Sequence, residues 1–338
     1  MRLDVQVIAW RGSIPESRHR VQVALAEADG RLRAATADPG MVTTFRSAAK
    51  PFQLLPLVER GHADRFGFDE PTLAVMAASH TGARRHVALV RAVLERLGLD
   101  PRHLACGAHD PSDPESLEDV RRDPASRDAL YNNCSGKHAG MLALCLAEGW
   151  PLAGYEQPGH PLQRLMRDTV AEACGVPSES VAVAVDGCSL SVFGLPLAAM
   201  ATGFARFAAA RADGTPRERA LARIRAAMAR HPFLVGGDDR FDTVLAERTG
   251  GRLVAKVGAE GLECVAVAER GWGLAIKCED GNLRATGPAT LAVLDHLGLL
   301  AAGEREALAP LRSPAVTNVR GLRAGAIEAE VRVADPVA

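Results

Sequence analysis

Apolar and polar residues alternate at the start of the chain. Val21, Val23 and Leu25 are separated by polar or small residues before Asp29-Gly30, and the run of residues 32–36 follows this turn. Alternation with a period of two before an Asp-Gly turn, followed by a second short run, is typical of a β-hairpin. The pattern therefore predicts that the chain begins with sheet.

Helical periodicity dominates the middle of the chain. Apolar residues recur at intervals of three and four between Ser47 and Gly61, with a bend expected at Pro56. Similar patterns predict the helices 71–79, 85–97, 136–148, 161–173, 195–209 and 215–229. The proline-rich stretch 109–128 predicts a surface loop with short helices. The helices are thus expected between residue 46 and residue 250.

Strand-like runs return late in the sequence. "GGRLVAKVGAEG", "LECVAVAE" and "GLAIKCEDGNLRAT" are separated by glycine-rich turns, and a helix is expected over 288–297. Earlier, the apolar run "ESVAVAVDGC" predicts a buried strand. Strands at both ends predict an α+β fold in which N- and C-terminal strands share an antiparallel sheet. We expect one domain, 1–338, with a sheet lobe at about 1–45 and 251–338 and a helical lobe at about 46–250.

Composition narrows the class of function. The chain has 338 residues, a formal charge of −1, a pI near 6.8 and 4% aromatic residues, which argues against a nucleic-acid partner and favours a small-molecule substrate. Seven scattered cysteines do not form a disulfide framework, so reduced thiols are expected. The N-terminus lacks the apolar core of a signal peptide, and no run reaches the roughly 18–20 apolar residues of a membrane span. A cytoplasmic location without membrane contact is expected.

A serine and a lysine stand three residues apart in "FRSAAKPFQ", residues 45–53. Pro51 has no backbone N–H and is tolerated only near the start of a helix, so this helix should begin near Ser47. At a helix start, unpaired N–H groups can stabilise an oxyanion, and Lys50 can reach the Ser47 hydroxyl as its base. In the alternative interpretation, Ser47 caps the helix and Lys50 is a solvated residue of its first turn.

Two further stretches place reactive side chains at the ends of predicted elements. "AASHTG", residues 77–82, ends a helix with Ser79, His80 and Thr81, which a sharp turn is expected to leave exposed together. Lys256 lies in "AKVGAEG", a strand that continues into a glycine-rich turn. The alternative interpretations are a polar helix stop and a solvated edge-strand lysine that discourages sheet pairing.

The stretch "YNNCSGKHAGM", residues 131–141, is dense in reactive side chains. Cys134 and Lys137 are three residues apart and share a helix face, and Cys188 follows a separate strand. Two thiolates suit zinc, whereas Lys137 could ligate only as a neutral amine. The sequence has no Cys-x-x-Cys pairs of the kind seen in structural zinc sites, so the residues alone leave metal binding open.

Taken together, these stretches resemble the Rhizobium-type L-asparaginase II family. "RSAAKPFQ", "ASHTG", "NNCSGKHAGM", "DGCS", "HPFLVGG", "KVGAEG" and "DGN" occur in the family's order, from "RG…ES.H" near residue 11 to "DGNLRA" near residue 285. "NNCSGKHAG" is the most specific of them. The resemblance implies a fold like that of serine β-lactamases, penicillin-binding proteins and glutaminases. It also implies a homodimer that hydrolyses L-asparagine to L-aspartate and ammonia.

The resemblance assigns roles to individual residues. Ser47 matches the nucleophile and Lys50 its base, while Ser79 and Lys256 match a second Ser–Lys pair that supports proton transfer. The zinc ligands that the resemblance implies are Cys134, Lys137 and Cys188. The substrate-binding residues that complete the implied site are Arg46, His80, Asn133 and Asp186. Zinc is expected to order the substrate rather than to activate the nucleophile.

The chain departs from the family pattern at three places. Ala83 stands where a glutamate is common, Cys188-Ser189-Leu190-Ser191 replaces "GCG.P", and Phe233 replaces the last residue of "HPE". These positions are expected to shape the substrate pocket, and loss of a carboxylate could relax selection for the substrate's α-ammonium. Two other functions stay open: a serine acyl-transfer enzyme for β-lactam or peptide-like amides, and a non-catalytic sensor of an amino acid or a metal.

Overall fold

The computed structural model describes residues 1–334, and the chain forms two compact units. We call Met1–Ala48, Leu195–Ala209 and the chain from Arg248 the sheet unit. Ala49–Gly194 and Ala210–Glu247 make up the helical unit. Each unit is described by itself below.

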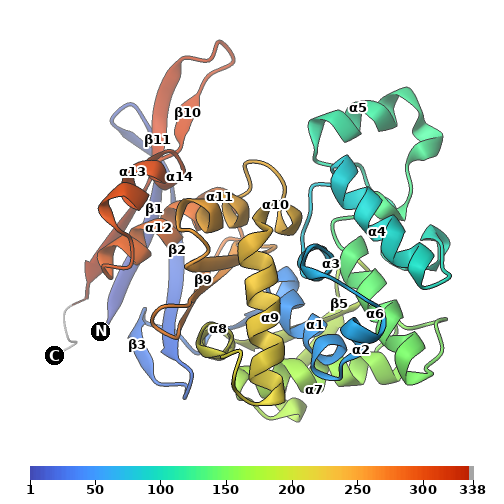
Figure 1. The fold of residues 1–338 in the computed structure, drawn as a ribbon. Helices are drawn as coiled ribbons and strands as arrows, with labels where there is room; N and C mark the ends of the chain where they lie inside the picture. Colours follow the sequence, from blue (N-terminus) through green and yellow to red (C-terminus); the bar gives the residue numbers. More distant parts are fainter. Residues whose placement is uncertain (335–338) are drawn as a thin grey trace. The chain divides into compact units, whose positions relative to one another are not determined.

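The sheet unit is built on one antiparallel sheet to which both ends of the chain contribute (Figure 1). Its strands lie in the order β10-β11-β1-β2-β9-β8-β7, and β3 pairs with β2. They are β1 (Leu3–Arg11), β2 (Ile14–Glu27), β3 (Leu32–Ala35), β7 (Leu253–Gly258), β8 (Leu262–Val267), β9 (Trp272–Cys278), β10 (Ala315–Thr317) and β11 (Arg323–Val333). The prediction of a sheet shared by N- and C-terminal strands is confirmed.

Local chemistry explains how this sheet is folded and covered. The predicted hairpin forms between β2 and β3, with Gly30 at a φ of 92° in the turn, a conformation that glycine adopts without strain. Helix α8 (Leu197–Ala209) packs on β2, β8 and β9. A Cβ atom at Gly273 of β9 would lie 2.1 Å from Ala201 O, so the absent side chain lets the helix approach the sheet.

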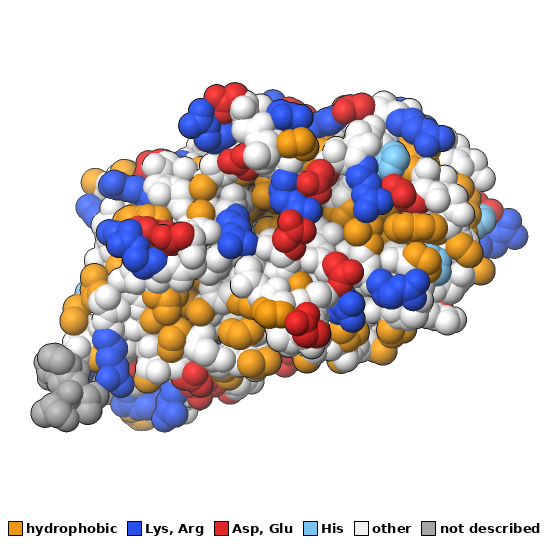
Figure 2. All heavy atoms as spheres, turned by 90° about the horizontal axis from the view of Figure 1, so that it is seen from below, with side chains coloured by type: hydrophobic (Ala, Val, Ile, Leu, Met, Phe, Trp, Pro, Cys, Tyr) orange, Lys and Arg blue, Asp and Glu red, His pale blue; other side chains and the backbone are white. Residues whose placement is uncertain are grey.

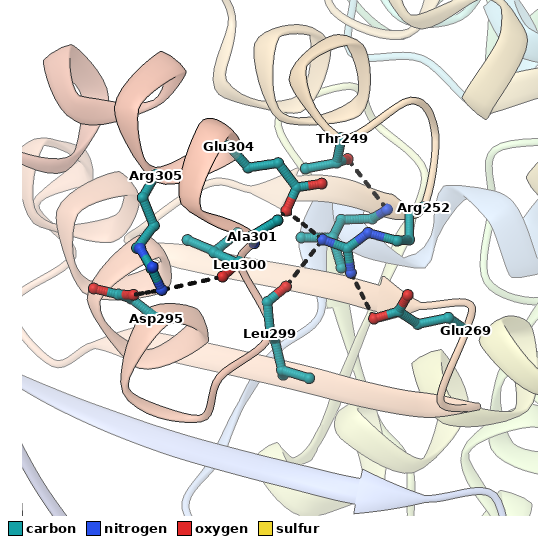
Figure 3. A network of polar contacts seen from close by, with 10 residues as sticks. Thr249, Arg252, Glu269, Asp295, Leu299, Leu300, Ala301, Glu304 and Arg305 are labelled. Carbon is teal, nitrogen blue, oxygen red and sulfur yellow. Dashed lines mark hydrogen bonds and ion pairs between the residues drawn. The ribbon is translucent and has the colours of Figure 1, made fainter.

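An arginine ties the C-terminal helices of the sheet unit to its strands (Figure 3). Arg252, next to β7, donates to Leu299 O at 3.0 Å and to Glu304 Oε2 at 2.5 Å, and a second amino group lies 2.7 Å from Glu269 Oε1. Glu304 also accepts the Ala301 N–H at the start of α13. The remaining elements of this unit are β4 (Val42–Thr44), η1 (Arg46–Ala49), η6 (Leu283–Ala285), α12 (Thr286–His296), α13 (Ala302–Ala307) and α14 (Ala309–Arg312).

Most of the helices that the sequence predicts lie in the helical unit, with bounds shifted by a few residues. The predicted helix 195–209 is α8, which belongs to the sheet unit and not to the expected helical lobe. The α-helices of the helical unit are α1 (Lys50–Glu59), α2 (His62–Arg65), α3 (Glu70–Met76), α4 (Arg84–Arg96), α5 (Pro114–Arg122), α6 (Ser135–Glu148), α7 (Pro161–Cys174), α9 (Pro216–Arg230), α10 (Pro232–Val235) and α11 (Phe241–Arg248). The short turns are η2 (Pro101–His103), η3 (Pro124–Ser126), η4 (Ala129–Tyr131) and η5 (Ser178–Ser180). The expected short helices in residues 109–128 are α5 and η3.

The run "ESVAVAVDGC" differs from its prediction. It forms the strand β5 (Ala182–Val185), which pairs with β6 (Ser191–Pro196), but all four residues of β5 are exposed, and Val185 retains 71% of its accessible surface. The expectation of a buried strand is therefore wrong. A run of apolar residues indicates a propensity to form a strand, whereas the burial of that strand depends on whether other segments pack over it.

The helices and the surface bear on the expectations about membranes and nucleic acids. None of the helices in residues 1–334 has the length and apolar character needed to cross a bilayer. Figure 2 shows acidic and basic side chains interspersed over one face. The seven cysteines are all free thiols, as the absence of a disulfide framework predicts.

Candidate active site

Ser47 lies in the short turn η1, which leads directly into α1. Pro51 occupies the first turn of α1, as its missing N–H requires, so the prediction of a helix start near Ser47 is confirmed. The N-cap of α1 is Ala49, without a side-chain hydrogen bond, so the interpretation of Ser47 as the cap of this helix is wrong. Arg46 has a φ of 47°, a left-handed conformation that costs a non-glycine residue free energy and is frequent at functional sites.

Lys50, the proposed base of the Ser47-x-x-Lys50 pair, is fully buried. Its side chain has no accessible surface, so the interpretation as a solvated first-turn residue is wrong. Its ammonium nitrogen, Nζ, lies 3.0 Å from Ser79 Oγ and 3.3 Å from Asn133 O, and it also donates to Ala78 O. Lys50 and Ser79 are therefore within the distance of direct proton transfer.

The "ASHTG" stretch forms a buried turn after α3 rather than an exposed one. The helix ends at Met76, and Ser79, His80 and Thr81 keep 6%, 2% and 8% of their accessible surface. The prediction that these side chains are exposed together is wrong. The reason is a contact that the local pattern does not contain: the Ser79 N–H donates to Val235 O at 2.9 Å, which attaches the turn to α10.

His80 is held as a neutral imidazole. The Gly82 N–H donates to its Nδ1 at 3.1 Å, so the ring proton resides on Nε2, which lies 2.9 Å from Ser135 Oγ. Burial, followed by the proximity of His86, holds the pKa of His80 well below its usual range. Ser135 in turn donates to Leu130 O at 3.0 Å. Ser135 lies inside the "NNCSGKHAG" motif, yet the sequence analysis gave it no role.

The two cysteines and the lysine of the predicted zinc site come together in the helical unit. Lys137 Nζ lies 3.2 Å from Cys188 Sγ, and the Cys188 thiol donates to Cys134. This hydrogen bond and the Lys137 charge hold the pKa of Cys134 well below its usual range, against the effect of burial. Burial alone would lower the pKa of Lys137, but the sulfur atoms of Cys134 and Cys188 outweigh it and raise that pKa.

The chemistry of these side chains fits a zinc ion. Two buried sulfur donors and one amine nitrogen are already adjacent, and the negative charge of Asp186 acts on Lys137. In residues 1–334 no third His, Cys, Asp or Glu forms a group with the two sulfurs in which all ligand atoms lie within 4.8 Å of one another. Lys137 would therefore supply the third donor, and it would have to lose a proton to do so.

Lys256 lies in the sheet unit, which also contains Ser47. It belongs to β7, the outer strand of the sheet, but its side chain has no accessible surface. The interpretation as a solvated edge lysine is therefore wrong. Its Nζ atom donates to Val257 O at 3.2 Å. A fully buried lysine is rare and calls for a structural or chemical reason.

Two positions that depart from the family pattern line one pocket of the helical unit. Ala83 and Phe233 border a pocket of about 660 Å³ together with Thr81. The Phe233 ring stacks on His86, with ring centroids 4.8 Å apart, and the Arg85 guanidinium lies 4.8 Å above the same ring. The pocket adjoins the turn that holds Ser79 and His80, so these departures are placed where they can influence substrate choice.

Comparison with known proteins identifies the relationship of the whole chain. The protein-family model described as L-asparaginase II matches residues 7–329. A search of curated proteins found no match. The matched span includes every candidate site residue from Arg46 to Lys256.

Proposed function

We propose that this chain, which belongs to the L-asparaginase II family, hydrolyses the side-chain amide of L-asparagine through an acyl-serine intermediate on Ser47. Family membership supports an asparaginase-type amidohydrolase that acts on a small molecule. In the proposal Lys50 is the base for Ser47. Ser79 and Lys256 form a second pair that assists proton transfer.

The observation that carries the proposal is the setting of Lys50. Its buried Nζ atom lies 3.0 Å from Ser79 Oγ, and it follows Ser47 by three residues at the start of α1. Geometry decides whether a group can act as a general base, and this separation allows transfer without a bridging water.

The steps conserve atoms and protons. The Ser47 oxygen attacks the amide carbon of asparagine while its proton passes to the neutral amine of Lys50. Lys50 and Ser79 deliver a proton to the departing nitrogen, and ammonia leaves behind an aspartyl ester. Water then attacks the ester, Lys50 accepts a proton from it, and L-aspartate leaves as a proton returns to the Ser47 oxygen.

The remaining site residues are proposed to bind substrate or metal. Zinc held by Cys134, Lys137 and Cys188 would supply a positive charge that orients a carboxylate or an amide oxygen. Substrate-binding roles are proposed for Arg46, His80, Asn133 and Asp186. Of these, His80 is neutral and can bind only as a hydrogen-bonding group.

The family resemblance supports two further proposals, a fold of the serine β-lactamase and penicillin-binding-protein type and a homodimer. We also propose a cytoplasmic location. Light scattering of the purified full-length chain tests the dimer directly, because it gives the mass in solution.

Ammonia release tests the proposed reaction. Zinc-loaded and chelator-treated protein is assayed with L-asparagine, L-glutamine and D-asparagine, in the wild type, in Ser47→Ala and in a control variant, Ser180→Ala. Ser180 is an exposed serine of η5, so its replacement should leave turnover unchanged. Ser47→Ala should lower the rate by about 10³-fold or more, with an unchanged circular dichroism spectrum.

Other outcomes point to the rival functions. Appreciable hydrolysis by Ser47→Ala would contradict the nucleophile assignment. Tight binding of L-asparagine without ammonia release would identify a sensor. Faster hydrolysis of a chromogenic β-lactam than of L-asparagine would identify a different acyl-transfer enzyme.

A further inference from the structure

We propose that His19, Cys278 and Asp280 form a second zinc site, located in the sheet unit. One ligand atom of each residue lies within 4.8 Å of the other two. Imidazole nitrogen, thiolate sulfur and carboxylate oxygen are the three ligand types that zinc takes in proteins. The inference goes beyond the proposed function and does not depend on it.

The strand register brings these residues to one face of the sheet. Val21 on β2 pairs with Cys278 on β9, and the next backbone contact, Glu279 N–H to Arg20 O at 3.0 Å, continues the same register. His19 therefore lies opposite Asp280. Because alternate residues of a strand point to the same face, the three side chains project from one side of the sheet. Rigid strands, rather than a flexible loop, hold two of the three ligands.

The three side chains already contact one another through protons that a metal would replace. The His19 ring nitrogen Nδ1 lies 2.6 Å from Asp280 Oδ2, and the Cys278 thiol donates to Asp280 Oδ1 at 2.9 Å. In a tetrahedral zinc site the ligand atoms are about 3.5 Å apart, given bond lengths of about 2.0–2.3 Å. Small side-chain rotations are therefore sufficient to open the space for an ion.

The proton balance of binding is favourable. Zinc would displace the proton of the Cys278 thiol to solvent, and the His19 Nδ1 proton would move to Nε2, so that the imidazole stays neutral. The bound ion, the thiolate and the Asp280 carboxylate then carry no net charge together. This matters because His19 and Cys278 keep only 3% and 0% of their accessible surface. The Asp280 side chain is about half exposed and leaves an entry path and a position for a water ligand.

Two positive side chains lie near the cluster. The Lys277 ammonium is held by two backbone carbonyls, Cys278 O and Glu260 O, at 2.6 Å each. The exposed Arg284 donates from Nε to His19 Nε2 at 3.1 Å and from a terminal nitrogen to Ser17 Oγ at 2.6 Å. Lys277 contacts the backbone of Cys278, whereas Arg284 contacts the side chain of a proposed ligand, His19.

Arg284 and zinc should compete through the tautomer of His19. A guanidinium has only donors, so its contact requires His19 Nε2 to be unprotonated and places the ring proton on Nδ1. Zinc on Nδ1 would move the proton to Nε2, where it would face the Arg284 N–H. Zinc binding therefore requires the Arg284 side chain to withdraw into solvent. A residue at position 284 that can accept a hydrogen bond from the His19 Nε2 proton should therefore raise the zinc affinity.

Zinc titration of chelator-treated, full-length protein tests the site. The background variant Cys134→Ser/Cys188→Ser removes the two sulfur donors of the helical unit, and we expect it to retain one zinc ion per chain. Adding Cys278→Ser should abolish this binding, and adding Asp280→Asn should weaken it by about tenfold or more. Asp29→Asn, an exposed carboxylate in the turn between β2 and β3, serves as the matched control and should change nothing.

Arg284→Gln supplies a test that a folding defect cannot imitate. The glutamine amide oxygen can accept the His19 Nε2 proton, so zinc affinity in the same background should rise by about tenfold. The proposal is overturned if the background variant binds no zinc, or if its zinc affinity is unchanged by both Asp280→Asn and Arg284→Gln. Ammonia release should persist in Cys278→Ser, which separates failure of this site from failure of the proposed hydrolysis.

Discussion

Cys134 in the helical unit and Cys278 in the sheet unit are both buried thiols, but their acidities are shifted in opposite directions. A hydrogen bond from Cys188 and the charge of Lys137 hold the pKa of Cys134 well below its usual range. Burial, together with a hydrogen bond to Asp280, raises the pKa of Cys278 to about 12. Burial is common to both, so the difference comes from the hydrogen bonds and charges: the Cys134 sulfur accepts a hydrogen bond, whereas the Cys278 thiol donates one to a carboxylate.

The difference has a consequence for metal uptake. The thiolate is the form that binds zinc, so the lowered pKa of Cys134 favours metal uptake at that sulfur, whereas Cys278 must first lose its proton. Zinc in the helical unit would still displace protons from Cys188 and Lys137, so zinc affinity should depend on pH in both units.

Gly136→Ala should disrupt the backbone that positions Cys134 and Lys137. A Cβ atom at Gly136 would lie 2.1 Å from Val75 O, a backbone atom that cannot move aside cheaply. We expect the free energy of unfolding to fall by about 3 kcal/mol, measured by urea denaturation. Gly187→Ala, beside Cys188, is the control because its Cβ would meet no atom within 4 Å. Equal urea midpoints for Gly136→Ala and Gly187→Ala would contradict the close packing of Gly136 against Val75.

Lys137→Met should reduce the thiolate content of metal-free protein. Without the ammonium charge the pKa of Cys134 rises, and each unit of that rise lowers the thiolate fraction about tenfold once the pKa exceeds the ambient pH. Thiolate ultraviolet absorbance, followed as a function of pH, reports the change. Lys277→Met removes a lysine next to Cys278 and should leave the neutral-pH signal intact. An unchanged titration in Lys137→Met would show that Cys188 and Lys50 stabilise the thiolate without the Lys137 charge.

Asp280→Asn should change the acid dependence of stability. The hydrogen bond from Cys278 lowers the pKa of Asp280 below its unfolded value of about 3.9, so its stabilising effect is present above that pH and is lost as the pH falls further. The difference in unfolding free energy between wild type and variant should therefore be constant from about pH 5 to 7 and shrink below about pH 4. A difference that does not vary with pH would rule out this carboxylate as the cause.

Arg252→Ala should have a small effect that involves neither thiol. Its ion pairs with Glu304 and Glu269 are partly buried, so we expect a loss of about 1 kcal/mol in the free energy of unfolding. Arg211→Ala removes an exposed pair with Asp213 and should leave the free energy of unfolding unchanged. Thiolate absorbance should be unchanged in both variants, because neither substitution removes a charge next to Cys134. This distinguishes a loss of stability from the loss of the Lys137 charge.

Sequence patterns identified the local elements because local chemistry determines them. The hairpin of β2 and β3 follows from alternation and an Asp-Gly turn, and the start of α1 follows from Pro51. The burial of Lys50 was not predictable in this way, since its partners Ala78 and Asn133 lie 28 and 83 residues away. The exposure of β5 was not predicted either, because it depends on whether segments distant in the sequence cover the strand.

The sequence motifs identified residues of the candidate site, but they did not predict which of these residues are in contact. The contact between Lys50 and Ser79 joins two motifs that the sequence analysis had assigned to different pairs. His19 and Asp280 were missed because 261 residues separate them, although each lies in a stretch that carries the family resemblance. Motifs that carry a family resemblance but have no assigned role can therefore indicate stretches that contain further functional residues. They do not indicate which atoms are in contact.

The contacts of Lys50 also set an order for events during synthesis on the ribosome. The carbonyl of Asn133, which accepts a hydrogen bond from Lys50, is made 83 residues after Lys50 itself. Until Asn133 has left the exit tunnel, the Lys50 side chain lacks this acceptor. The proposed nucleophile Ser47 therefore has incomplete surroundings in a nascent chain, and activity should first appear only in chains that extend well beyond α6.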